Sequence, residues 1–384
     1  RLNDKEILYG HDAQGIIVLA YEPNRIVQAV QQKTATNNLQ HFSSFTKAKA
    51  FWQEAGQQEH VYARSYFNAT LLHKLLNTLD NRKMQEMIEK LAGVKSIGGL
   101  IVQNHGKLRL QMETERDSSL NENTLKNETV LAHENLTSPL LQKTTLLHYR
   151  TSGFNKTFFR NFLPSAERKQ QYRKLEKSVQ NELGFSLDKF LEAIGPRTEI
   201  SVHEIINAGM FPLPKTVLAF QVQDRKAAGW ALERLRDTLK KQGVANEHQE
   251  RVQGHDLYYW TVMPVEATHL AIVLTDTMLY IANGESQLRA LLSEKKNSEP
   301  SKIVGDCITT ANAGAFLFRP ARFADQIAPV ADWLTDMMLA RGTGPGKKTQ
   351  KEVLTLMRSF DRITACSHRT ATGSRGEVVF KVFS

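Results

Sequence analysis

Apolar residues along the chain alternate in some segments and recur every three or four positions in others, which predicts strands and helices respectively. The clearest section runs from Thr216 to Met263. It predicts a strand, a helix and a two-stranded hairpin, at 217–222, 224–243, 249–253 and 257–263. Asp224 is the expected N-cap of the helix, Gly243 its expected end, and Gly254 the expected turn of the hairpin.

The second strand of this hairpin is apolar on both alternate faces, because Leu257, Tyr258, Tyr259 and Trp260 follow one another. This pattern predicts a strand that is covered on both sides. The three aromatic residues, and Trp230 on the preceding helix, also suit a binding surface. We interpret them as core residues, since sheets covered by helices bury such side chains.

The predicted strands are separated by one or two helices along most of the chain, and the hairpins alternate in the manner of antiparallel pairs with one buried face. The fold class expected from this order is α+β, with antiparallel sheets covered by helices.

The two ends of the chain show the same succession of predicted elements: a strand followed by a helix, a second strand followed by a helix, and a hairpin. The strands are expected at 15–20, 61–67, 97–103 and 108–112, and again at 277–282, 313–318, 363–369 and 378–382. We therefore expect an internal repeat in which residues about 7–114 resemble residues about 268–384. The turn of the last hairpin is placed at Gly373 to Gly376.

Between these copies, residues 116–143 are rich in Ser, Asn, Thr and Glu and lack apolar periodicity, which is typical of a linker or insert. We expect three segments: an N-terminal repeat unit at 1–115, the polar linker at 116–143, and a complete α+β unit at 144–384. The second half of that last unit would repeat the first domain.

The composition, 41% hydrophobic and 23% charged, is that of a globular chain and excludes collagen or wholesale disorder. The longest apolar runs are far shorter than the roughly 20 residues of a membrane helix, so no transmembrane span is expected. The two cysteines, Cys307 and Cys366, cannot form a disulfide framework or a zinc site. We interpret Cys366 as a buried structural thiol, while its pairing with Cys307 stays open.

Lys and Arg outnumber Asp and Glu by 50 to 40, so acidic partners have to be considered. More than half of the excess lies in the last 44 residues, and a second basic stretch lies on a predicted helix for which Ser165 is the expected cap. We interpret both mainly as solvated faces, and the helix as one that packs on a sheet. They supply the candidate partner-binding residues Arg168, Lys169, Arg173, Lys174, Lys347 and Lys348. No nucleic-acid-binding motif accompanies them, so a nucleic acid partner is not expected.

Two segments resemble catalytic motifs, but each lacks residues that the motif requires. The segment from Gly342 to Thr349 resembles a phosphate loop, yet Arg341 and Lys348 stand where that motif needs Gly and Ser or Thr. We interpret Gly342 as the C-cap of a helix at 320–340 and the following residues as a loop. His203-Glu204 lacks the second histidine of a zinc-protease motif, and no nucleophile elbow is present. We therefore expect no enzyme, no cofactor and no metal.

Several predicted elements together resemble a bacterial family of exported proteins labelled domain of unknown function 3352. They are the helix that begins at Asp224, the hairpin through Gly254, the strand pair at 270–282 and the segments 183–188 and 194–196. The resemblance covers roughly Leu146 to Phe383. It implies a periplasmic or other exported setting and no known activity, cofactor or site residue. If the complete unit is 146–383, residues 7–114 match only its second half. The first half of an earlier copy, with any signal or anchor, is then expected upstream of Arg1.

Two functions remain open. The first is a non-catalytic envelope protein whose repeated units bind a partner protein or an anionic surface. The alternative is a carrier that holds an apolar ligand or lipid between its sheet and helices. An apolar cavity of several hundred cubic ångströms would favour the carrier. Neither the ligand nor the oligomeric state follows from the sequence.

Overall fold

The computed structural model describes most of the chain in fifteen ranges: 8–11, 17–20, 43–55, 60–69, 94–104, 106–116, 138–152, 168–208, 211–243, 246–261, 263–293, 308, 311–340, 346–370 and 373–383. Two compact units divide it. Unit 1 consists of residues 1–125 and 369–377, and unit 2 of residues 126–368 and 378–384.

Unit 1 contains a small strand pair and a three-stranded part of the main sheet with one helix. Its elements are β1 (Leu8–His11), β2 (Ile17–Ala20), α2 (Ser43–Ala55), β3 (His60–Asn68), β4 (Val94–Asn104) and β5 (Lys107–Arg116). The helix α2 packs on the strands because Phe51 joins Leu100 and Val102 of β4 in one buried cluster.

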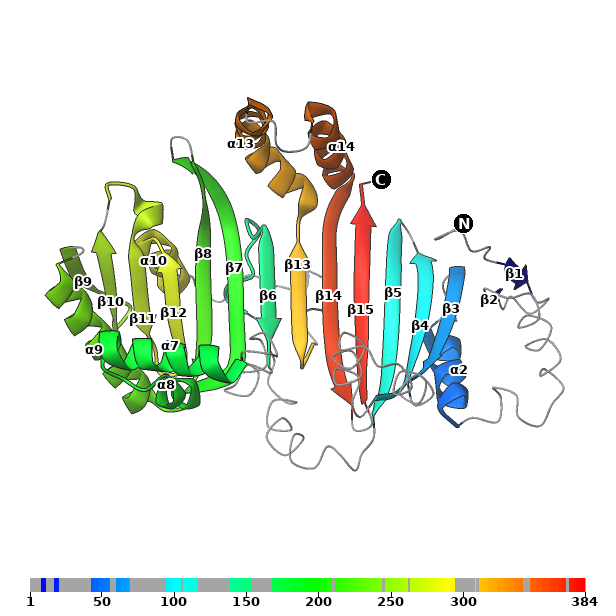
Figure 1. Ribbon diagram of the computed structural model, residues 1–384, viewed down its shortest axis with the longest axis horizontal. Coiled ribbons are helices and arrows are strands. Elements are labelled where there is room, and N and C mark those ends of the chain that lie inside the picture. Colours follow the sequence, from blue (N-terminus) through cyan, green and yellow to red (C-terminus); the bar gives the residue numbers. More distant parts are fainter. Residues whose placement is uncertain are drawn as a thin grey trace. The chain divides into compact units, whose positions relative to one another are not determined.

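Unit 2 contains most of the helices and strands (Figure 1). Its first elements are β6 (Leu147–Thr151), α7 (Arg168–Leu183), α8 (Leu187–Ala193), β7 (Ile194–Ala208), β8 (Phe211–Val222), α9 (Arg225–Gln242), β9 (Asn246–Val252) and β10 (His255–Thr261). They are followed by η5 (Glu266–Thr268), β11 (Leu270–Leu274), β12 (Met278–Asn283), α10 (Glu285–Ser293), β13 (Gly314–Phe318), α13 (Pro320–Ala340), α14 (Lys347–Arg358) and β14 (Phe360–Thr370). The last strand, β15 (Gly373–Val382), begins in unit 1 and ends in unit 2.

The expectation of antiparallel sheets covered by helices is wrong. Thirteen strands follow one another in a single open, antiparallel order: β3-β4-β5-β15-β14-β13-β6-β7-β8-β12-β11-β10-β9. The alternating patterns were sufficient to predict strands, but alternation carries no information on which strands become neighbours. The long pair of β7 and β8 continues the series from β6 to β12, so the strands of unit 2 join one sheet.

Residues about 7–114 and about 268–384, which were expected to repeat one another, do not have the same arrangement of strands. Its first strands behave differently: β2 pairs with β1 in a separate two-stranded sheet, whereas β12 lies between β8 and β11 in the large one. The later strands keep the same local order, β3-β4-β5 and β13-β14-β15. The helices expected after the strands at 15–20 and 61–67 fall outside the described residues.

The local predictions for residues 216–263 are confirmed. The side chain of Asp224 accepts hydrogen bonds from the backbone N–H groups of Lys226 and Ala227, both at 3.0 Å, and Gly243 ends α9 with a φ of 63°. The hairpin of β9 and β10 turns at Gln253 and Gly254, both of which have positive φ. A two-residue turn of this kind matches the twist of the strands, and glycine adopts it without strain.

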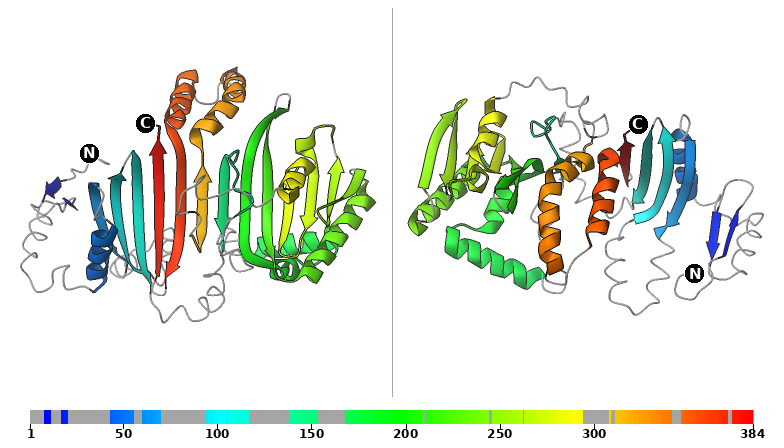
Figure 2. Two further views of the ribbon diagram at one scale, coloured as in Figure 1. Left: turned by 180° about the vertical axis from the view of Figure 1, so that it is seen from behind. Right: turned by 90° about the horizontal axis from the view of Figure 1, so that it is seen from above.

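The strand β10 is covered on both faces, as its sequence predicts. On one face Leu257 packs with Leu288 of α10, and on the other Trp260 packs with Leu232 of α9. Figures 1 and 2 show the two helices on opposite sides of these strands. Trp260 is therefore a core residue, whereas Trp230 is 43% exposed and its interpretation as core is wrong.

The helices α13 and α14 form a hairpin that extends past the ends of β13 and β14 (Figure 1). Lys347, Lys348 and Thr349 are the first residues of α14, with Gly346 as its N-cap, so their interpretation as a loop is wrong. Gly342 lies outside the described residues. In the ranges that the structure describes, no helix combines the length and the apolar content that crossing a bilayer requires.

Cys366 of β14 is disulfide-bonded, which corrects its interpretation as a buried thiol. Its position is buried, with 5% of the residue exposed, in a cluster with Leu141, Ala315 and Leu317. The chain contains one other cysteine, Cys307, which the structure does not describe.

Candidate functional site

The helix α7 places a row of cations on its outer face. Its inner face is held by Tyr172, which packs with Leu187 and Leu191 of α8, and whose hydroxyl donates a hydrogen bond to Asp188. Helical geometry then turns Arg173, Lys174 and Lys177 away from the core, and all three are exposed. The stripe on α7 was expected to pack on a sheet, and α7 packs on the helices α8 and α9.

Among the described residues, no acidic side chain forms an ion pair with Arg173, Lys174 or Lys177. Glu182, one turn further along α7, accepts a hydrogen bond from Ser178 at 2.6 Å instead. Arg168 and Lys169 belong to the first turn of the same helix, and their side chains are outside the described part. Four of the six predicted partner-binding residues therefore lie on α7.

The other two predicted residues begin α14, where the structure gives them different roles. Three polar bridges join α14 to α13: Lys347 to Asp336 at 2.6 Å, Gln350 to Asp332 at 2.8 Å and Arg358 to Asp325 at 2.8 Å. The charge of Lys347 thus stabilises the hairpin of α13 and α14.

Lys348 and Lys351 lie on the outer part of α14 and, within the described ranges, pair with no acid. Val353 and Leu356 of the same helix are 49% and 62% exposed. The two basic helices occupy different places in unit 2: α7 lies against α8 and α9, and α14 lies above β14 (Figure 1).

A buried polar cluster lies on β6 and β7, and no sequence argument identified it. The register pairs His148 with Ser201 and Arg150 with Glu199, so alternate residues of the two strands point to one face. All four are at most 2% exposed. Ser138, at the end of the predicted linker, covers the same face and donates a hydrogen bond to Glu199.

Ion pairs and hydrogen bonds balance the charges of this cluster. Two nitrogens of Arg197 approach one carboxylate oxygen of Glu199 at 2.6 Å, and Arg150 donates to the carbonyl oxygens of Ile308 and Ala311 at 3.1 and 2.9 Å. Burial raises the pKa of Glu199, but the charges of Arg197 and Arg150 and the hydrogen bond from Ser138 oppose this effect, and the pKa lies below its ordinary value. The carboxylate is therefore ionised, and the cluster stabilises an ion pair inside the core.

His148 is neutral in this cluster. Burial lowers the pKa of the imidazole to about 4, although the nearby Glu199 opposes the shift. Its Nε2 atom is 3.8 Å from the carboxylate, and neither ring nitrogen has a hydrogen-bond partner among the described residues. Since Ser138 donates to Glu199 and not to the histidine, the three side chains do not form a nucleophile–base pair.

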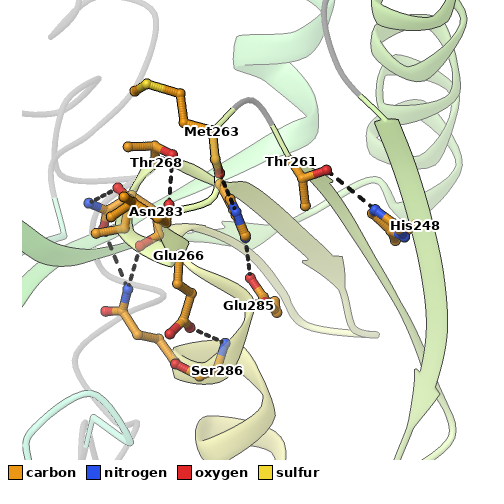
Figure 3. A network of polar contacts seen from close by, with 12 residues as sticks. His248, Thr261, Met263, Glu266, Thr268, Asn283, Glu285 and Ser286 are labelled. Carbon is orange, nitrogen blue, oxygen red and sulfur yellow. Dashed lines mark hydrogen bonds and ion pairs between the residues drawn. The ribbon is translucent and has the colours of Figure 1, made fainter.

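A further polar network fixes the beginning of α10 (Figure 3). A carboxylate oxygen of Glu266 accepts a hydrogen bond from the backbone N–H of Ser286 at 2.9 Å. Glu285 contacts Nδ1 of His269 at 3.0 Å, and Asn283 donates to the carbonyl oxygen of Ala267 at 3.1 Å. These contacts tie the loop at 263–269 to the helix and stabilise its N-terminus. In the described residues, no three His, Cys, Asp or Glu side chains converge as metal ligands.

Comparison with known proteins identifies a family but no activity, ligand or partner. A family model described as "Protein of unknown function (DUF3352)" matches residues 7–318, and the chain belongs to this family. The match begins far before Leu146, where the resemblance in the sequence was expected to start, and ends with β13. No curated protein and no solved structure matches the chain.

Proposed function

We propose that this member of the DUF3352 family is a non-catalytic, exported binding protein that docks on an anionic lipid surface through α7. The observation that carries the proposal is the exposed row of Arg173, Lys174 and Lys177, for which the described residues supply no acidic partner. Cations that no acidic side chain of the described residues neutralises are available to an external anion.

The free energy of binding to an anionic membrane follows from the number of cations on α7. Each Lys or Arg near an anionic membrane contributes about 1 kcal/mol, so three contribute about 3 kcal/mol at low salt. Leu175 of α7 is 38% exposed. Trp230 of α9 is 43% exposed and lies against Phe185, which follows α7, with 6.4 Å between the ring centroids. Exposed indole and leucine side chains beside cations favour a lipid interface over a purely polar partner.

The disulfide of Cys366 supports an exported setting, because disulfides persist in oxidising compartments such as the bacterial periplasm and are rare in the cytosol. This supports the periplasmic location that the family resemblance implied.

The burial of the His148–Glu199 cluster supports a non-catalytic role. A general acid or base has to come within hydrogen-bond reach of a substrate atom. His148 and Glu199, at 0% and 1% exposure, are closed to any substrate in the folded structure.

The alternative function, a carrier of an apolar ligand, has less support. The faces of β10 are filled by the clusters around Leu257 and Trp260. A cavity of about 380 Å³ does lie between strands and helices, but Lys215, Arg322 and Glu204 are among its lining residues. Such walls do not suit a purely apolar molecule.

Vesicle co-sedimentation tests the docking proposal. We expect the protein to bind phosphatidylcholine vesicles that contain phosphatidylglycerol, and to bind pure phosphatidylcholine vesicles much more weakly. The double variant Lys174→Glu, Lys177→Glu should bind the anionic vesicles at least roughly 30-fold less well, because two attractive contributions of about 1 kcal/mol are lost and two repulsive charges are added. Added salt should weaken wild-type binding, since it screens exposed charges.

The matched control is Lys348→Glu, Lys351→Glu, which changes the net charge by the same amount on α14. Binding close to that of the wild type is expected for this control. Equal losses in both double variants would show that net charge and not the α7 face determines binding. Equal binding of the wild type to both kinds of vesicle would contradict the lipid proposal altogether.

A further inference from the structure

A second candidate binding site is the cavity of about 380 Å³ in unit 2. Its walls come from β7, β8, the segment before β6, α10 and α13. Ligand sites are typically concave spaces of roughly 300 to 1,000 Å³ with a few polar groups on mainly apolar walls. The volume is thus sufficient for a small ligand.

The cavity carries an excess of positive charge. Arg322 donates a hydrogen bond from Nη1 to the carbonyl oxygen of Lys143 at 2.6 Å, and no acidic side chain among the described residues pairs with it. Lys215 lies 3.3 Å from a carboxylate oxygen of Glu204, which is 54% exposed at the rim. Among the residues that line the cavity, two cations and one exposed carboxylate leave a net positive charge for an anion.

His203 adds a neutral hydrogen-bond acceptor. Burial lowers the pKa of its imidazole to about 4, so the ring is uncharged at neutral pH. The hydroxyl of Thr145 donates to the carbonyl oxygen of Leu140 at 3.1 Å, and the hydroxyl oxygen of Thr145 lies 3.3 Å from Nδ1 of His203. The hydroxyl proton is used, so Nδ1–H is the donor to Thr145, and Nε2 carries the free lone pair.

The rest of the lining is mixed: apolar side chains such as Leu140 and Leu291 lie beside polar ones such as Gln287 and Gln326. Water occupies about 30 Å³ per molecule, so 380 Å³ has room for on the order of a dozen non-hydrogen atoms. A carboxylate at Arg322 and Lys215, with a short hydrocarbon chain against the leucines, satisfies both kinds of wall.

We infer that unit 2 binds a small amphipathic carboxylate in this cavity, with Arg322 and Lys215 holding the carboxylate. This site is independent of α7, because its cations come from β8 and α13. The protein would thus combine surface docking with the capture of a small organic anion.

Isothermal titration calorimetry of the full chain with octanoate tests this inference. We expect saturable binding of octanoate, and binding of octan-1-ol at least about tenfold weaker, because the alcohol lacks the charge that Arg322 and Lys215 would contact. Arg322→Gln and Lys215→Gln should each raise the Kd for octanoate by about tenfold or more. Arg319→Gln is the matched control: Arg319 donates to the same Lys143 carbonyl at 3.0 Å but does not line the cavity.

A thermal shift on adding octanoate provides a second readout, because a ligand that binds only the folded state raises Tm. Four results would overturn the inference: no saturable binding of octanoate, equal affinity for octan-1-ol, equal Kd values for Arg322→Gln and Arg319→Gln, or no change in Kd with Lys215→Gln. The Lys174→Glu, Lys177→Glu variant should bind octanoate like the wild type, so the two proposals fail separately.

Discussion

The buried imidazole of His148 should make the stability of this protein depend on pH in a defined window. Its pKa is lowered from 6.5 to about 4 in the folded state, so between these values the unfolded chain binds a proton that the folded chain does not. Folding stability therefore falls as the pH drops from about 6.5 toward about 4, and the loss between about pH 7 and about pH 5 is about 2 kcal/mol for this one residue. Protonation is unfavourable in the fold because burial outweighs the attraction of Glu199.

The variant His148→Leu removes this proton site and keeps an apolar side chain of similar size beside Leu317, the residue opposite His148 on β13. Urea unfolding at both pH values should show that the variant gains about 2 kcal/mol relative to the wild type on acidification. Ser201→Ala, at the cross-strand partner of His148, removes a buried hydroxyl without a titrating group and should cost the same at both pH values. A stability difference between wild type and His148→Leu that stays constant with pH would refute the reasoning.

Two further predictions concern the cluster and a close strand contact. Glu199→Gln leaves the neighbouring guanidinium groups without their carboxylate and should lower the free energy of unfolding in urea by about 3 kcal/mol or more. The control Glu204→Gln, at an exposed position on the same strand, should lower it by less than about 1 kcal/mol. Similar losses in the two variants would contradict a buried ion pair. Gly373→Ala would place a Cβ on the carbonyl oxygen of Thr114 and should lower stability by about 1–3 kcal/mol, with faster amide exchange in β5. Gly346→Ala, whose added Cβ meets no atom within 4 Å, is the control, and an equal effect of both alanines would be inconsistent with this contact.

Local elements were predictable wherever the signal lies in adjacent residues. Asp224 and Gly243 mark the ends of α9 because capping depends on the backbone within one turn. The turn of the last hairpin was misplaced: β15 already begins at Gly373, and glycine stands there because β5 approaches its backbone closely. That approach involves residues about 260 positions apart, so no local pattern contains it.

The candidate surfaces were predictable in part. Arg173 and Lys174 are exposed on α7 because Tyr172 fixes the helix by its inner face, and the apolar stripe indicated that face. The ion pair of Lys347 with Asp336 could not be predicted, because Asp336 lies on another helix. The ion pair of Arg197 and Glu199 was missed because charged residues in a strand normally indicate its solvent face.

By itself the sequence determined the periods of the strands and helices, their caps and turns, the basic faces and the family resemblance. Those properties depend on neighbours within a few positions, where spacing and side-chain chemistry are sufficient. Only the tertiary structure decided the thirteen-strand order, the burial of His148 and Glu199 and the cavity beside Arg322. Each of these depends on strand pairing and packing between distant segments, and the free energy of such contacts is not encoded in any one of the segments alone.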